Sequence, residues 1–166
     1  WQEFLEALAG QAGIAIDRLN MYLKLKQANM ELVQAYDATI AGLARVLELR
    51  DMETQGHSQR VVELMLALAR KMGLENDQFT NIRRGALLHD IGKMGIPDHI
   101  LHKPGKLTEE EWQIMRQHPV YAYQMLAPIE YLKDALDIPY YHHERWDGTG
   151  YPEGLSGAEI PLTARM

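Results

Sequence analysis

The first third of this chain carries one long helical pattern, and this pattern limits the folds open to the rest. No proline occurs before Pro97, so no residue in that stretch breaks a helix by lacking a backbone N–H. From Ile16 onward, apolar residues recur at alternating steps of three and four, which is the spacing of a coiled-coil seam. The seam positions are Ile16, Leu19, Leu23, Lys26, Met30, Val33, Asp37, Ile40, Ala44 and Leu47. We therefore predict an all-α protein that begins with a coiled-coil helix over residues 1–49.

Two polar residues interrupt this seam. Lys26 and Asp37 stand where apolar side chains are expected. Polar seam residues can fix the register and the number of strands at a cost in stability. The alternative is a single amphipathic helix packed on its own domain. A helical pattern beyond about 25 residues without a strong stop favours the coiled coil, so we predict a parallel homodimer through this helix.

Composition excludes several kinds of chemistry. The chain has no cysteine, which removes disulfides, thiolate metal sites and thiol catalysis and is consistent with a reducing compartment. Its net charge is −6 with histidine neutral, so it has no basic field for a polymeric nucleic acid. No apolar run approaches the roughly 18 residues of a membrane segment, and no signal-peptide pattern opens the chain. We expect a cytoplasmic protein whose metal ligands are histidine and carboxylate.

Shorter helices are predicted after the first. One runs to Met72 and is closed by Gly73, because glycine is favoured just beyond a helix C-terminus. Another covers residues 78–88, and a third begins at Thr108 and is interrupted by His118-Pro119. We also expect a short helix over residues 138–145, a structured loop over residues 146–157 and a helix that begins at residue 158.

A histidine and an aspartate stand side by side where the helix over residues 78–88 ends. His89 offers a neutral nitrogen and Asp90 an anionic oxygen, a pair suited to Zn, Mn or Fe. By itself such a pair is more often a buried histidine beside a helix-ending aspartate. Glu53 and His57 are four residues apart on one helical face and form a second weak pair. An ordinary exposed Glu-His pair is the alternative there.

Five histidines on predicted helices or at their ends point to one shared site. They are His57, His89, His118, His142 and His143. With Glu53 and Asp90 they could line the interior of a helical bundle, which is how bundles build multi-metal sites. Independent core histidines would each need a separate buried partner. His99 and His102 lie in a polar loop and are expected to face solvent.

Several long motifs, in order along residues 50–166, resemble the HD-GYP family of cyclic di-GMP phosphodiesterases, a branch of the HD phosphohydrolases. They are Thr54 to Val61, His89 to Lys93, Gly95 to Gly105, Met115 to Pro119 and His142 to Pro152. The last contains the Gly150-Tyr151-Pro152 stretch that names the family. The segment from Leu8 to Leu19 resembles the end of a GAF sensory domain running into a signalling helix. The resemblance implies an HD-domain helical bundle over residues 50–166.

The resemblance also implies roles for individual residues. The implied metal ligands are Glu53, His57, His89, Asp90, His118, His142 and His143. They would hold two divalent transition-metal ions, or three where Glu53 adds a carboxylate, and Fe, Mn or Zn would suit them. Lys93 would contact the substrate phosphate, and Asp51 would orient that lysine or a bound water. The loop at Gly150-Tyr151-Pro152 would border the guanine-nucleotide pocket.

Two departures from the family pattern are expected to matter. The family continues with a further aspartate ligand and basic substrate-binding residues beyond the position of Met166, so this ligand set would be short of one carboxylate. Either the chain is shortened or its C-terminal helices are omitted from this sequence. A glycine that is usual after the His-Pro pair is Ala122 here, which we expect to change packing slightly.

Together these features predict metal-dependent hydrolysis of the phosphodiester bonds of cyclic di-GMP in bacterial second-messenger signalling. Two ions about 3.5–4 Å apart activate a water and neutralise the phosphate, with Asp90 as the natural bridging ligand. Lys93 adds fixed positive charge where negative charge develops. Diguanylate cyclase (GGDEF) domains are candidate partners. Two alternatives stay open: a nucleotide phosphohydrolase of the wider HD superfamily, which has no need of the Gly-Tyr-Pro loop, and a non-catalytic HD-GYP interaction module.

Overall fold

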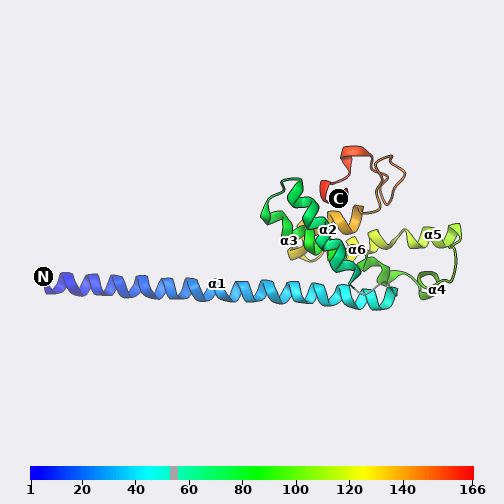
Figure 1. Ribbon diagram of the computed structural model, residues 1–166. Coiled ribbons are helices and arrows are strands. Elements are labelled where there is room, and N and C mark those ends of the chain that lie inside the picture. The colour runs from blue at the N-terminus through cyan, green and yellow to red at the C-terminus, as the bar shows by residue number, and fades with distance from the viewer. Residues whose placement is uncertain (53–55) are drawn as a thin grey trace. The chain divides into compact units, whose positions relative to one another are not determined.

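The regular structure of this protein is helical, as predicted. The computed structural model describes residues 1–52 and 56–166, and within these the only extended pairing is an isolated bridge between Asp147 and Ser156. Helix α1 runs from Gln2 to Asp51 (Figure 1). The chain divides into two compact units, residues 1–39 and residues 40–166. The predicted domain boundary after residue 49 stays a prediction.

The first unit is the N-terminal part of α1 alone. Its apolar side chains face solvent, among them Leu19 with 56% and Leu23 with 52% of their surface exposed. A helix that is apolar on exposed faces needs another element to cover it. Residues 1–39 therefore have no core of their own among the described residues.

The second unit packs helices around one core. It contains α2 (His57–Lys71), α3 (Asn76–Leu88), α6 (His118–Leu126) and α7 (Asp137–Tyr141), with α2 and α3 side by side (Figure 1). Apolar residues on their inward faces form the core together with the last turns of α1. The core residues include Ile40, Ala44, Val62, Met65, Ala69, Ile82, Ala86, Leu87, Leu88, Leu126, Leu132 and Ile138.

The predicted coiled-coil seam is wrong at its last three positions. Ile40, Ala44 and Leu47 are buried within the second unit, with 6%, 2% and 5% of their surfaces exposed. Side chains that are already covered by their own domain cannot form the seam with another helix. The alternative of an amphipathic helix packed on its own domain holds for this part of α1.

Shorter elements connect the core helices and carry the site. They are η1 (Ile91–Gly95), α4 (Asp98–Leu101), α5 (Glu109–Met115), η2 (Glu130–Ala135), η3 (Gly157–Glu159) and η4 (Leu162–Ala164). Thr108 caps α5 as predicted, since its hydroxyl accepts from the Glu111 N–H. The helix predicted from Thr108 is interrupted next to His118-Pro119, as expected, so that α5 ends at Met115 and Pro119 lies in the first turn of α6.

Two of the predicted helices are corrected. The helix expected over residues 138–145 already ends at Tyr141, so His142 and His143 follow it. The helix expected from residue 158 consists of two separate 3-10 turns with Pro161 between them. A proline disfavours helical geometry in the residue before it, and Ile160 is extended there. No described helix is both long enough and apolar enough to cross a membrane.

Candidate metal centre

Four potential metal ligands converge in the second unit from three separate segments. Asp90 follows α3, His118 is the first residue of α6, and His142 and His143 follow α7. Each offers one ligand atom, and these four atoms all lie within 4.8 Å of one another. The burial of α3 and α6 in the core brings these helix ends together, so packing rather than sequence proximity builds the cluster.

Gly92 permits the close approach on which this cluster depends. A Cβ at position 92 would lie 1.8 Å from the carbonyl oxygen of His118 and 2.6 Å from the amide nitrogen of Ala122. Both contacts are with backbone atoms of α6, which cannot swing aside. The missing side chain therefore lets η1 lie directly on α6, and Asp90 and His118 become neighbours.

Backbone carbonyls orient the histidine rings toward the cluster. The Nδ1 atoms of His89 and His118 each lie 2.8 Å from a carbonyl oxygen, those of Ala86 and Met115. Nδ1 of His142 lies 3.1 Å from the carbonyl of Ile138. A carbonyl only accepts, so Nδ1 is the donor in each of these contacts, and in a neutral ring of this tautomer Nε2 is the atom that carries the lone pair. Metal-binding histidines are held in this way in proteins.

Two of these nitrogens face each other. Nε2 of His118 lies 3.2 Å from Nε2 of His142, and Oδ1 of Asp90 lies 3.4 Å from the first and 3.6 Å from the second. In the neutral tautomers with the proton on Nδ1, both Nε2 atoms and the Asp90 oxygen can direct lone pairs at one ion placed between them, so the donor set fits a divalent metal ion.

Burial keeps part of this cluster in the form that binds metal. It lowers the pKa of His118 to about 4. Burial and the neighbouring His142 lower the pKa of His143 to about 3. Both rings are therefore neutral at pH 7, as a metal ligand must be.

Asp90 is held as a carboxylate at the centre of a charge network. Burial acts to raise the pKa of Asp90, but hydrogen bonds from His142 and His89 and the charge of Lys93 outweigh it and hold the pKa well below its usual range. Oδ2 of Asp90 lies 3.0 Å from Nε2 of His89 and 3.0 Å from Nζ of Lys93. The two oxygens of the Asp90 carboxylate thus face different neighbours. Oδ1 faces His118 and His142, and Oδ2 faces His89 and Lys93.

Lys93 stays charged beside this carboxylate. Its Nζ donates to Oδ2 of Asp51 at 2.6 Å. Burial acts to lower the pKa of Lys93, but the carboxylates of Asp90 and Asp51 raise it above its usual value. A permanent ammonium group therefore lies beside the candidate metal ligands.

Arg50, near the end of α1, holds the backbone around Lys93, a role that was not predicted from the sequence. The Arg50 guanidinium donates to the backbone carbonyls of Lys93 at 3.2 Å and Ile96 at 2.9 Å and pairs with Asp98 at 2.8 Å. Arg50 thus fixes the backbone of Lys93 while Asp51 holds its side chain. Only the adjacency of Arg50 to Asp51 could have suggested this role.

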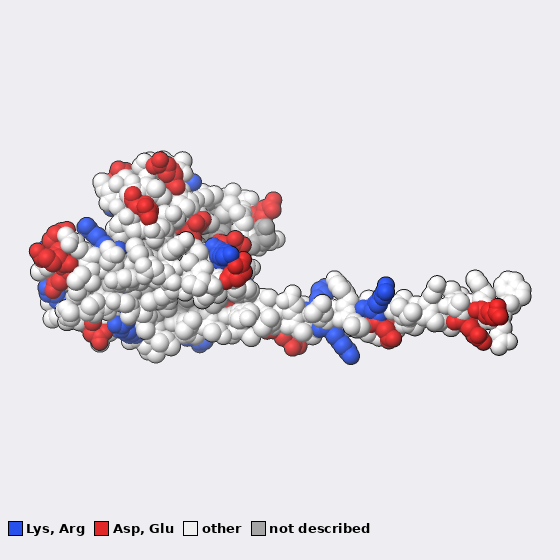
Figure 2. All heavy atoms as spheres, turned by 180° about the vertical axis from the view of Figure 1, so that it is seen from behind, with Lys and Arg blue, Asp and Glu red and all other residues white. Residues whose placement is uncertain are grey.

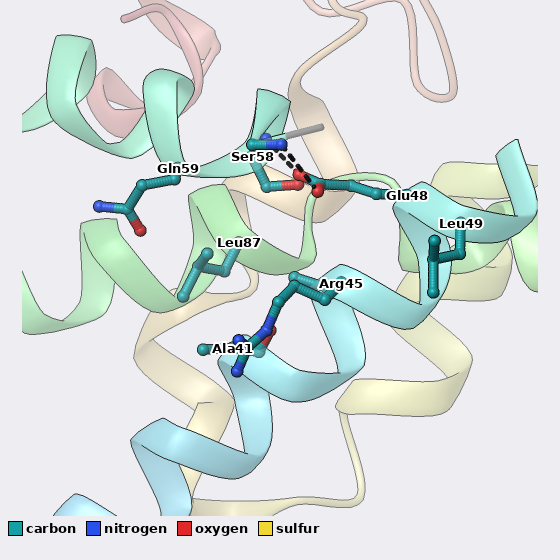
Figure 3. Close-up of a pocket in the computed structure, with 9 residues that line it drawn as sticks. Ala41, Arg45, Glu48, Leu49, Ser58, Gln59 and Leu87 are labelled. Carbon is teal, nitrogen blue, oxygen red and sulfur yellow. Dashed lines mark hydrogen bonds between the residues drawn. The ribbon is translucent and has the colours of Figure 1, made fainter. Parts of the chain in front are cut away.

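Glu48 caps α2 from outside that helix. Its Oε1 accepts from the Ser58 N–H at 2.8 Å and its Oε2 from the Gly56 N–H at 3.1 Å, as Figure 3 shows for Glu48 and Ser58. The N-cap residue Gly56 has no side chain for this task. Glu48 therefore fixes the first turn of α2, where His57 lies.

The cluster opens into a cavity of about 320 Å³. Its walls include Asp51, His89, Asp90, Lys93, Trp112, Met115, His118, His142, His143 and Tyr151. Trp112 lines this cavity with 41% of its surface exposed. A neighbouring pocket of about 520 Å³ shares Trp112 and Tyr151 and adds Arg116 and Arg145.

A larger groove of about 750 Å³ beside Glu48 has no histidine in its described lining, so donor chemistry rather than size identifies the site (Figure 3).

The loop after α7 closes against the cluster. The Tyr151 ring stacks on His143 with their centroids 4.6 Å apart. A Cβ at Gly150 would lie 2.4 Å from the Arg145 amide nitrogen, so only glycine allows the loop to lie this close. The Glu144 carboxylate accepts from three backbone N–H groups, those of Glu153, Gly154 and Leu155. Pro152, expected to touch substrate, follows Tyr151 through a cis peptide bond.

The remaining predicted ligands lie at different places. His89 contacts Asp90 as described, and His57 neighbours His89 with ring centroids 6.1 Å apart. Glu53 lies outside the described residues. The structure thus gathers Asp90, His118, His142 and His143 in one group, with His89 and then His57 next to it.

A family model described as an HD domain matches residues 42–166. The chain belongs to the HD domain family. The chain is 37% identical over 167 residues to the 3'3'-cGAMP-specific phosphodiesterase 2 of Vibrio cholerae, covering 99% of the chain and 31% of the relative. It is 49% identical over 120 residues to the cyclic di-GMP phosphodiesterase of Thermotoga maritima, covering 70% of the chain and 32% of the relative.

A cyclic di-GMP phosphodiesterase of Vibrio cholerae is 40% identical over 157 residues, covering 86% of the chain and 32% of the relative. These relatives confirm the resemblance to the HD-GYP branch of the HD domain family. The chain spans 31–32% of the length of these three relatives.

Proposed function

We propose that this HD domain hydrolyses a phosphodiester bond of cyclic di-GMP with the help of divalent metal ions. The observation that carries the proposal is that a cluster of Asp90 and three histidines shares one cavity with the protonated Lys93. A phosphodiester is an anion and water is a poor nucleophile at neutral pH, so a site with positive charge and an activated water suits its hydrolysis. The names of the relatives support a cyclic dinucleotide as the substrate.

Asp90, His118, His142, His143 and His89 would hold two ions of Fe, Mn or Zn, with His57 as a further ligand. A third ion at Glu53 belongs to the same proposal. When bound, the ions would lower the pKa of a water and neutralise phosphate oxygens. All-histidine and carboxylate ligation suits these three metals.

The chain's own groups supply the remaining functions. Lys93 would hold its proton on Nζ and place a positive charge against the reacting phosphate. Asp51 would keep that ammonium in place through its 2.6 Å hydrogen bond. Tyr151, Gly150 and Pro152 would shape the nucleotide pocket beside the cluster.

A second substrate has a specific observation in its favour. The relative that covers 99% of this chain is named as specific for 3'3'-cGAMP. That molecule differs from cyclic di-GMP in one base and has the same phosphodiester backbone. The metal cluster and Lys93 would treat the two substrates alike, so the choice would depend on the walls around the bases.

The test is hydrolysis of both dinucleotides by the full-length protein after loading with Mn²⁺ or Fe²⁺. We expect one or both to be cleaved, and Lys93→Met to lower kcat by about 100-fold because a charge aimed at the transition state is lost. Lys71→Met, at an exposed site near the end of α2, is the matched control and should keep full activity. A metal-loaded protein that cleaves neither dinucleotide would overturn the proposal and favour the interaction module.

Several expectations accompany this proposal. Association with diguanylate cyclase domains, a cytoplasmic location, a parallel homodimer and the origin of residues 8–19 in a GAF domain stay predictions. The homodimer would bring two catalytic units under the control of one helical stem.

A further inference from the structure

A second pocket lies directly beside the metal-ligand cluster. We call this pocket of about 520 Å³ the side pocket. Its described lining shares Trp112, His142, His143 and Tyr151 with the cavity of about 320 Å³ into which the cluster opens. Volumes of this size are typical of sites for small ligands. A dinucleotide whose phosphate lies at the cluster therefore has room for one of its bases in the side pocket.

The C-terminal turn of α5 forms one wall of the side pocket. Trp112 lies in α5 and Arg116 is its C-cap, with the Arg116 N–H donating to the Trp112 carbonyl at 2.9 Å. Residues four apart lie on the same face of a helix, and both side chains line the pocket. The guanidinium carbon of Arg116 lies 5.9 Å from the centre of the Trp112 ring and 5.8 Å from that of Tyr151. The cation thus lies within contact range of two aromatic rings from separate segments.

The loop after α7 forms another wall of the side pocket. Its Tyr151 ring stacks on His143, and the Tyr151 N–H donates to the His143 carbonyl at 3.3 Å. Glu144 is the only carboxylate in the described lining, and it accepts from three backbone N–H groups of this same loop. These contacts hold Tyr151 as a fixed surface that borders both cavities.

Two arginines give the side pocket a local positive charge. Arg116 and Arg145 stand against Glu144 alone in the described lining. The chain as a whole has a net charge of −6, and Figure 2 shows lysine and arginine side chains scattered among acidic ones on the face in view. A ligand that is drawn to the side pocket therefore responds to these arginines rather than to a basic surface.

Arg116 is the arginine that can turn to a ligand. Arg145 makes two hydrogen bonds to Asp147, each of 3.4 Å. Arg116 lies 3.9 Å from Glu109, and these two side chains are 48% and 70% exposed. An exposed pair at this distance contributes little to stability, so Arg116 can exchange it for a contact with a ligand.

Guanine and adenine differ in the groups that they offer to a guanidinium. Guanine presents two neighbouring acceptors, O6 and N7, whereas adenine presents the acceptor N7 beside its N6 amino donor. Arginine donates and does not accept, so it forms a bidentate pair with guanine only. Aromatic rings such as Trp112 and Tyr151 bind the flat faces of all bases and do not discriminate between them.

We propose that Arg116 selects guanine at this site. Its guanidinium donates to O6 and N7 of one base of the dinucleotide, which lies in the side pocket against Trp112 and Tyr151. This inference rests on the proposed hydrolysis of a cyclic dinucleotide. A phosphate fits the same place less well, because two aromatic walls give an anionic oxygen no partner. Arg116 therefore decides between bases, whereas Trp112 adds affinity for either base.

Exchange of Arg116 for glutamine tests this selection, because a glutamine side chain pairs with N6 and N7 of adenine. The full-length, metal-loaded protein is given cyclic di-GMP and cyclic di-AMP, which share one backbone and differ only in their bases. We expect Arg116→Gln to lower kcat/KM for cyclic di-GMP and to raise it for cyclic di-AMP, so that their ratio changes by about 10-fold. A parallel loss on both substrates, or no gain on cyclic di-AMP, would overturn the proposal.

Two further variants separate selection from general binding. Arg83→Met removes an exposed arginine of α3 outside the described linings of both cavities, so it should leave the ratio and both rates unchanged. Trp112→Leu should raise KM for both dinucleotides by a similar factor of about 10, because stacking is lost for either base. Circular dichroism checks that each variant is folded. A shift of the ratio in Trp112→Leu as large as that in Arg116→Gln would contradict the role assigned to Arg116.

Binding measurements distinguish a failure of this inference from a failure of the proposed hydrolysis. Calorimetry on the Lys93→Met protein, which turns over slowly, gives the dissociation constants of both dinucleotides with and without Arg116→Gln. A preference for guanine that Arg116→Gln removes supports the assignment even where the unaltered protein cleaves neither dinucleotide. Hydrolysis of cyclic di-GMP together with an unchanged preference refutes the assignment and leaves the proposed function standing.

Discussion

Gly92 shapes the candidate metal site although it offers no ligand atom. It lies between Asp90 and Lys93 in the sequence, and its absent side chain lets η1 lie on α6. Ala122, whose amide nitrogen lies at this contact, is fully buried.

Substituting Gly92 should therefore disrupt fold and site together. In Gly92→Ala the new Cβ would overlap the His118 carbonyl oxygen, so we expect a loss of about 3 kcal/mol in the free energy of unfolding. Metal affinity should fall as well, because η1 must move away from α6. Urea unfolding and calorimetric metal titration measure the two effects.

Gly10→Ala is the control for this experiment. Nothing lies within 4 Å of a Cβ at Gly10, which is inside α1. Alanine is favoured over glycine in a helix interior by about 1 kcal/mol, so this change should be neutral or stabilising. If Gly92→Ala were as stable as Gly10→Ala, the close approach of η1 and α6 would be disproved.

At the scale of elements, the last turn of α1 holds two separate parts of the site. Glu48 caps the N-terminus of α2, and Arg50 and Asp51 hold the backbone and side chain of Lys93. A shift of this turn would move Lys93 and the first turn of α2 together. These contacts couple the last turn of α1 to the candidate site within the second unit.

The cap on α2 should make stability depend on pH. Burial acts to raise the pKa of Glu48, but hydrogen bonds from Ser58 and Gly56 outweigh it and lower the pKa. A carboxyl whose pKa is lower in the folded state stabilises the fold above its unfolded pKa, and this contribution is lost as pH falls through the folded pKa.

We therefore expect Glu48→Gln to be less stable than the unaltered protein by about 1 kcal/mol at pH 7. The difference should shrink as the pH falls below about 4, because the carboxylate cap is then protonated in the unaltered protein also. Chemical unfolding at both pH values measures it. Glu63→Gln, on α2 and exposed, is the control, and a deficit that stayed constant with pH would contradict the assigned cap.

At the scale of the whole molecule, the donor cluster joins three distant segments of the chain. Asp90, His118 and His143 belong to parts of the second unit that only the folded state brings together. A ligand that binds the folded state alone stabilises it by mass action. Metal ions should therefore act on the stability of the entire unit.

Removing metal with a chelator should lower the melting temperature, and Mn²⁺ should restore it. At a free metal concentration 100 times its dissociation constant, the gain is about 2.7 kcal/mol. His143→Ala should reduce this gain, whereas His99→Ala, which changes a residue outside the cluster, should keep it. Differential scanning calorimetry gives both values, and equal gains in the two variants would argue against the assigned ligands.

Local patterns allowed much of the fold to be predicted from the sequence. The long first helix, the cap at Thr108 and the break at His118-Pro119 each depend on neighbours a few residues away. The structure near the C-terminus was harder to predict. The turns after residue 157 were predicted as one helix because the effect of Pro161 on Ile160 was not considered. The roles of Arg50, Glu48 and Trp112 were missed because their partners lie in other segments.

The sequence by itself determined the helical class of this protein, the candidate metal donors and the family to which the chain belongs, because residue types and their spacing carry that information. Only the tertiary structure decided which donors meet and which face of α1 is covered. Leu43 and Ala44 are adjacent and both apolar, and nothing local distinguishes them. The core of the second unit buries Ala44 and leaves Leu43 exposed, because the neighbouring helices can cover only one direction of α1.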